Sequence, residues 1–247
     1  MDVFEAVASR RSIRKFTPEP VSRSLLREII EAATRAPSAK NAQPWEFIIV
    51  DGKPLEDLKK ANVEALTAGD FAQSEVLQVP FQGIYRERQV DLAVRLFQAM
   101  GIEREDEAKR NDWQERGFRF FDAPAAIFLA IDKSIDSDMT FLDVGAVMQS
   151  ICLVATGSGL GTCIEDQGAM FPEVVRKHTG VPASKRIVIC VAIGYPDPEF
   201  PANKLKTPRE PVDNVITWVN GGQNAWCSSG VTRHKLEASG VGPQRLK

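Results

Sequence analysis

The spacing of apolar residues predicts an amphipathic helix near the start of the chain, between Ser22 and Pro37. Ser22 is a suitable N-cap, and the proline ends the pattern. The apolar positions recur every three or four residues, which places them on one helical face: Leu25, Leu26, Ile29, Ile30 and Ala33. Further helices are predicted over 2–10, 53–68, 86–100, 104–121 and 171–180.

Two long apolar runs predict strands that are buried in the core, over 123–132 (APAAIFLAID) and 186–195 (RIVICVAIGY). A shorter strand is predicted over 46–50, ending at the Asp51–Gly52 turn. Between the two long runs, residues 141–156 form a helical segment that is apolar nearly all round. Such a helix belongs in a protein core or in a subunit interface.

The charge of the 247-residue chain is balanced, with 31 Lys and Arg against 33 Asp and Glu. We therefore expect neither a nucleic acid nor a membrane as partner, and no apolar stretch reaches the roughly 20 residues of a membrane helix. The N-terminus begins acidic and lacks an apolar run, so no signal peptide is expected and the predicted location is cytoplasmic. Without a CxxC pair, the cysteines are predicted to be reduced and mostly buried: Cys152, Cys163, Cys190 and Cys227.

Histidine is scarce, because only His178 and His234 occur. Two histidines can hardly supply a zinc site, so no metal is expected. A Ser-His-Asp hydrolase would have to use one of them. If the chain is an enzyme, a bound cofactor is expected to carry the difficult chemistry.

The glycine run GSGLGT (157–162) does not match a dinucleotide-binding fingerprint, since position 162 is threonine and the run follows a helix. Two interpretations stay open for it. It is either a helix C-cap or a turn that lets the backbone approach a flat ligand closely.

Two basic segments lie far apart in the sequence, RRSIRKF (10–16) and KLKTPRE (204–210). Either could be a solvated charge cluster. Together they would suit a phosphate group, which binds arginine through paired hydrogen bonds. A third segment, APSAKNAQPW (36–45), presents polar side chains between two prolines. It is either a plain connection or a rigid ligand-binding loop.

These motifs, followed by VAIGYPDPEFPANKLKTPREPVDNVITW (191–218), occur in an order that resembles the FMN-dependent nitroreductase family. The resemblance implies an α+β, three-layer fold with a central, mostly antiparallel sheet flanked by helices. It implies an intertwined homodimer with FMN at the interface. The FMN-binding domain is expected over 1–218, and a C-terminal extension that wraps the partner or is poorly ordered over 219–247.

The resemblance also assigns cofactor contacts. The arginine motif and the C-terminal segment would supply Arg10, Arg11, Ser12, Arg14, Lys206 and Arg209. The loop from the partner chain would supply Pro37, Ser38, Ala39, Asn41 and Gln43. The backbone facing flavin N5 would come from Gly161, Thr162, Ile164, Glu165 and Asp166, the last standing where many relatives have glycine. The aromatic residues Phe71, Phe81, Tyr85 and Phe120, with Phe118 and Phe121 beside them, are candidates for the substrate pocket, with the core as the alternative for each.

The activity implied by the resemblance is a ping-pong reaction in which NAD(P)H reduces FMN and a nitroaromatic or quinone-like acceptor is then reduced. Two alternatives stay open. One is another reaction on the same flavin fold: dehalogenation, enone reduction, flavin fragmentation or a biosynthetic dehydrogenation. The other is a flavin-binding protein without turnover.

Overall fold

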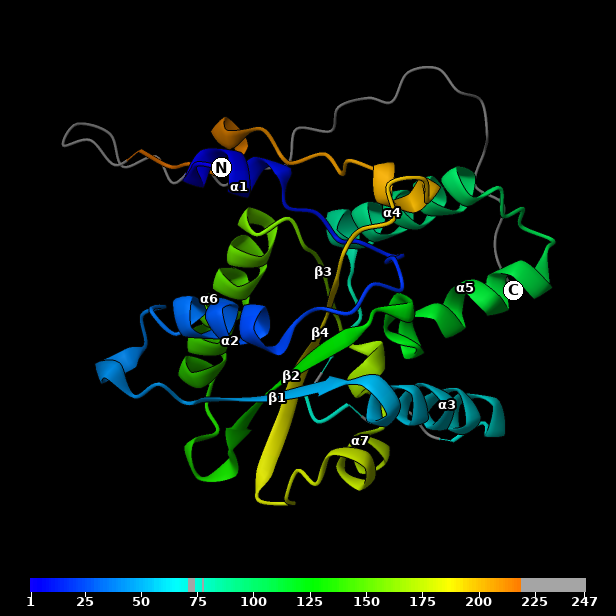
Figure 1. The fold of residues 1–247 in the computed structure, drawn as a ribbon. Coiled ribbons are helices and arrows are strands. Elements are labelled where there is room, and N and C mark those ends of the chain that lie inside the picture. Colours follow the sequence, from blue (N-terminus) through cyan, green and yellow to red (C-terminus); the bar gives the residue numbers. More distant parts are fainter. Residues whose placement is uncertain (71–73, 77, 219–247) are drawn as a thin grey trace. The chain divides into compact units, whose positions relative to one another are not determined.

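The computed structural model describes residues 1–70, 74–76 and 78–218. The chain divides into two units, Met1–Lys206 and Thr207–Lys247. The first unit holds a four-stranded sheet with helices on both faces (Figure 1). In the second unit, the described residues contain a short 3-10 turn over Val212–Asn214. The predicted C-terminal extension lies outside the described residues.

The sheet consists of β1 (Trp45–Asp51), β2 (Ala125–Asp132), β3 (Gly161–Glu165) and β4 (Lys185–Gly194). Its strand order is β1-β2-β4-β3, and every neighbouring pair is antiparallel. β2 is buried along its whole length except at its last residue. Both long apolar runs are therefore strands at the centre of the sheet, as the sequence predicts.

One face of the sheet is covered by α2 (Arg23–Ala33) and α6 (Asp138–Gly157) (Figure 1). The Ser22 hydroxyl accepts a hydrogen bond from the amide of Leu25 at 3.2 Å, which confirms the predicted N-cap. The core between these helices and the sheet is aliphatic and includes Leu26, Ile29, Ile127, Leu129, Ile131, Val147 and Ile151.

The other face is covered by α3 (Gly52–Ala68) and α7 (Pro172–Thr179). Because successive strand residues point to opposite faces, Ala126 and Phe128 of β2 face this second core. They pack in one cluster with Leu55, Leu58 and Val175. The result is the three-layer arrangement that the sequence resemblance implies.

Outside these layers, the residues that the structure describes also form α1 (Val3–Ser9), α4 (Gly83–Met100) and α5 (Glu107–Phe118). α1 begins with a capping box between Asp2 and Glu5, whose side chains each accept from the other's backbone amide. α5 is capped by Asp106, whose carboxylate accepts from the amide of Lys109 at 3.1 Å.

α6 runs for 20 residues from Asp138, so it is longer than the helix that the sequence predicts over 141–156. By length and hydropathy alone it could cross a membrane, so the expectation that no apolar stretch reaches this length is wrong. In this fold α6 packs against α2, α1 and the sheet, with Val147, Ile151 and Ala155 fully buried.

Candidate functional site

The arginine segment RRSIRKF is joined to the edge of the sheet. Ser12 forms a bridge with Thr162 of β3, and the amide of Ile13 donates to the Thr162 carbonyl at 2.9 Å. Ile13 and Phe16 are buried in the core. These two apolar side chains anchor the segment in the core. Arg14, which lies between them in the sequence, is half-buried.

Asn203, near the C-terminal end of the first unit, holds this segment in place through hydrogen bonds. Its Oδ1 accepts from the amide of Arg14 at 2.6 Å, and its Nδ2 donates to the carbonyls of Lys15 at 2.8 Å and Asp197 at 2.9 Å. The Nε of Arg11 donates to the Asn203 carbonyl at 2.7 Å. Arg11 thus serves the backbone here, and Asn203, which sequence reasoning missed, sets the position of Arg14.

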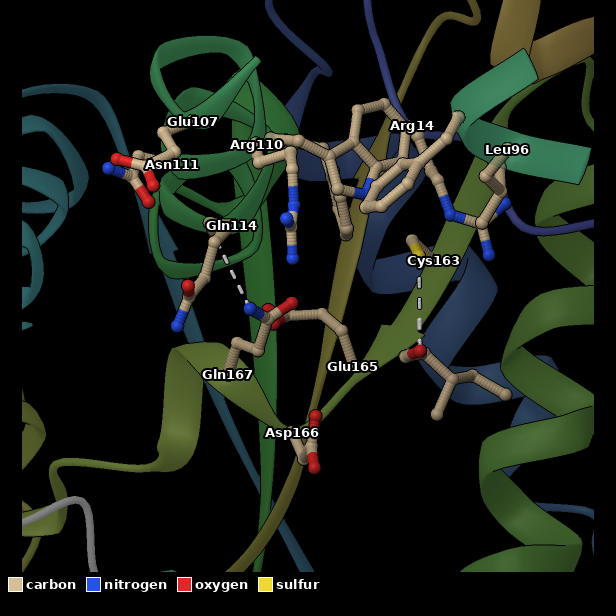
Figure 2. Close-up of a pocket in the computed structure, with 14 residues that line it drawn as sticks. Arg14, Leu96, Glu107, Arg110, Asn111, Gln114, Cys163, Glu165, Asp166 and Gln167 are labelled. Atoms are coloured by element: carbon tan, nitrogen blue, oxygen red, sulfur yellow. Dashed lines mark hydrogen bonds between the residues drawn. The ribbon is translucent and has the colours of Figure 1, made fainter. Parts of the chain in front are cut away.

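A cavity of about 650 Å³, called the β3 cavity below, opens above the end of β3. Arg14 and residues 163–167 line its floor. Much of the wall comes from Leu96 of α4 and from one side of α5, namely Glu107, Arg110, Asn111, Trp113 and Gln114. Figure 2 shows the side chains of Arg14 and Arg110 entering it from two sides. The fold thus joins three segments that are far apart in the sequence.

Glu165 ends β3 as a fully buried carboxyl group. Its Oε2 accepts from the amide of Gly168 at 2.8 Å, while Oε1 has no hydrogen-bond partner among the described residues. Burial raises the pKa of Glu165 to about 8, against the opposing effect of the Gly168 hydrogen bond. The group is therefore mostly neutral at pH 7. Burial likewise raises the pKa of the neighbouring Cys163 thiol to about 12, so neither Glu165 nor Cys163 places a full negative charge on the floor.

The two residues after Glu165 tie the floor to other elements. The Asp166 carboxylate accepts from the side-chain amide of Gln78, in the connection between α3 and α4. Gln167 donates to the carbonyl of Gln114 at 3.1 Å. Its side chain also fills the space beside Gly117, where an added Cβ would lie 1.8 Å from Gln167 Oε1. α5 is thereby held directly against the end of β3.

The loop APSAKNAQPW lies elsewhere in the chain, at the start of β1 and beside α6 (Figure 1). The amide of Ala39 donates to both carboxylate oxygens of Asp143 on α6, at 3.1 and 3.2 Å. The Ser38 hydroxyl accepts from the amide of Gln43 at 2.9 Å. None of the loop lines the β3 cavity of its own chain. Its predicted reach into a partner's site stays a prediction.

Of the predicted cofactor residues, Arg14, Ile164, Glu165 and Asp166 line the β3 cavity. Gly161 and Thr162 are buried at the start of β3. Arg10 and Ser12, which precede Arg14 in the arginine segment, are half-buried. Lys206 is exposed at the end of the first unit. Arg209, in the second unit, donates to the carbonyls and hydroxyl of its own loop.

Of the aromatic pocket candidates that the structure describes, Phe121 alone lines the β3 cavity. Phe120 is 0 % exposed and packs edge-on against Phe128 in the core, whereas its neighbour Phe121 does line the cavity. Phe81 and Tyr85 are exposed at the beginning of α4. Phe71 lies outside the described residues.

The charged groups of the site fit an anionic cofactor such as FMN. Within the part of the chain that the structure describes, neither Arg10 nor Arg14 forms an ion pair with a carboxylate. Among the described residues, the Arg14 guanidinium makes one hydrogen bond, a weak one to the Ser12 carbonyl at 3.4 Å. A half-buried guanidinium with most of its donors free is suited to bind an anion or a carbonyl-rich ring edge.

The sequence profile of the Nitroreductase family matches residues 7–195, which is more than half of the chain. The chain belongs to the nitroreductase family. It is 31% identical over 219 residues to a nitrobenzene nitroreductase of Ectopseudomonas oleovorans, covering 87% of this chain and 96% of that protein. It is 33% identical over 212 residues to a 4-nitrobenzoate reductase of Pseudomonas putida, covering 85% and 92%.

The fold gives the same result. A solved structure of the FMN- and NADPH-dependent nitroreductase NfnB from Sphigopyxis sp. strain HMH superimposes with a TM-score of 0.85. It is 33% identical in sequence, and the match covers 89% of this chain and 100% of that one. The family assignment thus rests on sequence and on structure, and the implied α+β architecture is confirmed.

Proposed function

We propose that the protein is an FMN-dependent oxidoreductase that takes hydride from NAD(P)H and passes it to a small nitroaromatic acceptor. Family membership and the cofactors named for the NfnB relative support this activity. The single structural observation that carries it is the unpaired Arg14 guanidinium on the floor of the β3 cavity.

When bound, FMN supplies the ring that accepts and donates hydride. Arg14 would hold the pyrimidine side of that ring, and Arg10 and Ser12 the phosphate end. Because Glu165 is mostly neutral at pH 7, its carboxyl group does not cancel the positive charge of Arg14. The backbone of residues 164–166 would lie along the ring, while Phe97 and Trp113 in the wall reduce access of water.

We further propose that two copies form the functional unit. α1 exposes Val3, Phe4 and Val7, with Phe4 85% exposed, and α6 exposes Met139 and Leu142. Apolar side chains exposed to this extent on two packed helices are typical of a subunit interface. The Ser38 loop, held to α6 by Asp143, would then be carried to the partner's flavin.

The first experiment is spectroscopic. Purified protein saturated with FMN should be bleached by NADH or NADPH under anaerobic conditions, and nitrobenzene should restore the oxidised spectrum. Bleaching by dithionite alone would overturn the activity and favour a flavin carrier.

The second experiment tests the arginines. Arg14→Gln should weaken FMN binding at least tenfold, because a charge-assisted hydrogen bond contributes about 1.5–3 kcal/mol. Arg209→Ala should also reduce FMN retention. Arg27→Gln, at an exposed position on α2, is the matched control and should bind FMN as the unaltered protein does. Equal FMN affinity in all variants would contradict the proposed cofactor site.

A further inference from the structure

The basic residues of α5, together with Arg119 just after it, differ in whether an acidic side chain pairs with them. Lys109, Arg116 and Arg119 each lie within ion-pair distance of a carboxylate, at 2.9 Å for Lys109 and 3.2 Å for the closest Arg119 pair. Arg110 has no carboxylate within that distance among the described residues. It is also the member of this group that lines the cavity.

The position of Arg110 is set by its surroundings. Its Nη1 donates to the carbonyl of Arg104 at 3.0 Å, in the loop before α5. Residues four apart on a helix share one face, so Arg110 lies on the same face as Gln114, whose carbonyl accepts from Gln167. The contact that fixes α5 on the end of β3 therefore also directs Arg110 toward the floor, as Figure 2 shows.

The groups around Arg110 define what it could bind. Phe97 and Trp113 supply flat apolar surface in the same wall. Of the acidic groups in the cavity, Glu165 is mostly neutral at pH 7 and Asp166 is hydrogen-bonded to Gln78. Glu107 lies one helical turn before Arg110 and is exposed, as Arg110 is, but the two form no ion pair in the described part of the chain. One Arg110 donor serves the Arg104 carbonyl, which leaves four N–H groups for a ligand.

We propose that Arg110 is the specificity-determining residue for the acceptor, and that the preferred substrates are nitroaromatic acids whose carboxylate binds its guanidinium. The inference rests on the proposed function and narrows it. Guanidinium and carboxylate form paired, charge-assisted hydrogen bonds, and the apolar wall would hold the aromatic ring. Arg14 is then free to serve the flavin, so the two unpaired arginines of the cavity have separate roles.

The test compares two acceptors of nearly equal shape, 4-nitrobenzoate and the uncharged 4-nitrobenzamide. Steady-state kinetics with a saturating nicotinamide should be measured for the holoenzyme and for the Arg110→Gln, Arg110→Lys and Arg104→Gln variants. Arg110→Gln should lower kcat/KM for 4-nitrobenzoate at least tenfold, mainly through KM, and change the value for the amide less than threefold. Arg110→Lys should retain part of the preference, and Arg104→Gln all of it.

A binding assay without turnover provides the second readout. Benzoate should perturb the flavin absorbance of the oxidised holoenzyme at lower concentration than benzamide does, and Arg110→Gln should abolish that difference. Equal effects of the variant on both acceptors, or none on either, would overturn the inference while leaving the proposed function intact.

Two more outcomes are decisive. If Arg110→Gln raised KM for NADPH and left that for 4-nitrobenzoate unchanged, the arginine would serve the nicotinamide dinucleotide, and the inference would be wrong. If the unaltered holoenzyme reduced neither acceptor, the proposed function itself would fail.

Discussion

Replacement of Glu165 by glutamine should remove a large pH dependence of stability. The carboxyl group is fully buried, and burial raises its pKa from the usual 4.5 to about 8. Between these values the folded protein holds a proton that the unfolded chain releases. Stability must therefore fall as the pH rises through this interval, and it becomes constant above about pH 8.

The size of the effect follows from the same pKa. Each pH unit inside the interval lowers the free energy of unfolding by roughly 1.4 kcal/mol, so the whole interval corresponds to about 5 kcal/mol. Groups with a lowered pKa, such as the half-buried Asp122 beside Lys15, act in the opposite direction. Their effect lies below about pH 4 and outside this window.

The assay is denaturant unfolding at fixed protein concentration with excess FMN, at intervals from pH 5.5 to 8. The unaltered protein should lose stability across the series, and Glu165→Gln should show a nearly flat profile because its amide cannot ionise. Glu28→Gln, at an exposed position on α2, is the control and should keep the original slope. Parallel profiles for the unaltered protein and Glu165→Gln would refute the assignment of a neutral buried carboxyl group.

Two other substitutions test the packing that positions the site. Asn203→Ala leaves the Arg14 amide and two carbonyls without partners. It should therefore lower the free energy of unfolding by about 2–4 kcal/mol and weaken FMN binding, as measured by denaturant unfolding and by flavin titration. Unchanged FMN affinity would show that the position of Arg14 does not depend on Asn203. Ser22→Ala removes the N-cap of α2 and should cost about 1 kcal/mol with normal flavin content, and a loss of flavin would contradict a purely local role.

The layers of the fold could be predicted from the sequence because each depends on a local pattern. The apolar runs of β2 and β4 and the helical period of α2 give the correct elements, within a few residues at their ends. The predicted boundaries differ from the observed ones where capping decides them. α6, which is capped by Ser137, begins at Asp138, three residues before the predicted start.

The walls of the β3 cavity could not be predicted in this way. α5 carries charges of both signs along its length, so no pattern shows which of its cations lacks an acidic partner. In the described part of the chain that cation is Arg110, because Asp106, Asp112 and Asp122 pair with the others. Phe120 and Phe121 are adjacent and alike in sequence. Both adopt positive φ, at 56° and 52°, and both are buried in the same core cluster, but Phe121 also lines the cavity and Phe120 does not.

The junction at Asn203 has a consequence for biosynthesis. Its side chain accepts a hydrogen bond from the backbone amide of Arg14, 189 positions earlier. β4, the strand that precedes Asn203, ends only at Gly194. A nascent polypeptide emerging from the ribosome can therefore form its early helices, yet it cannot dock the arginine segment until almost the whole first unit has been translated. Contacts of such long sequence separation form slowly, so competence to capture the flavin should be the last property that a newly made chain acquires.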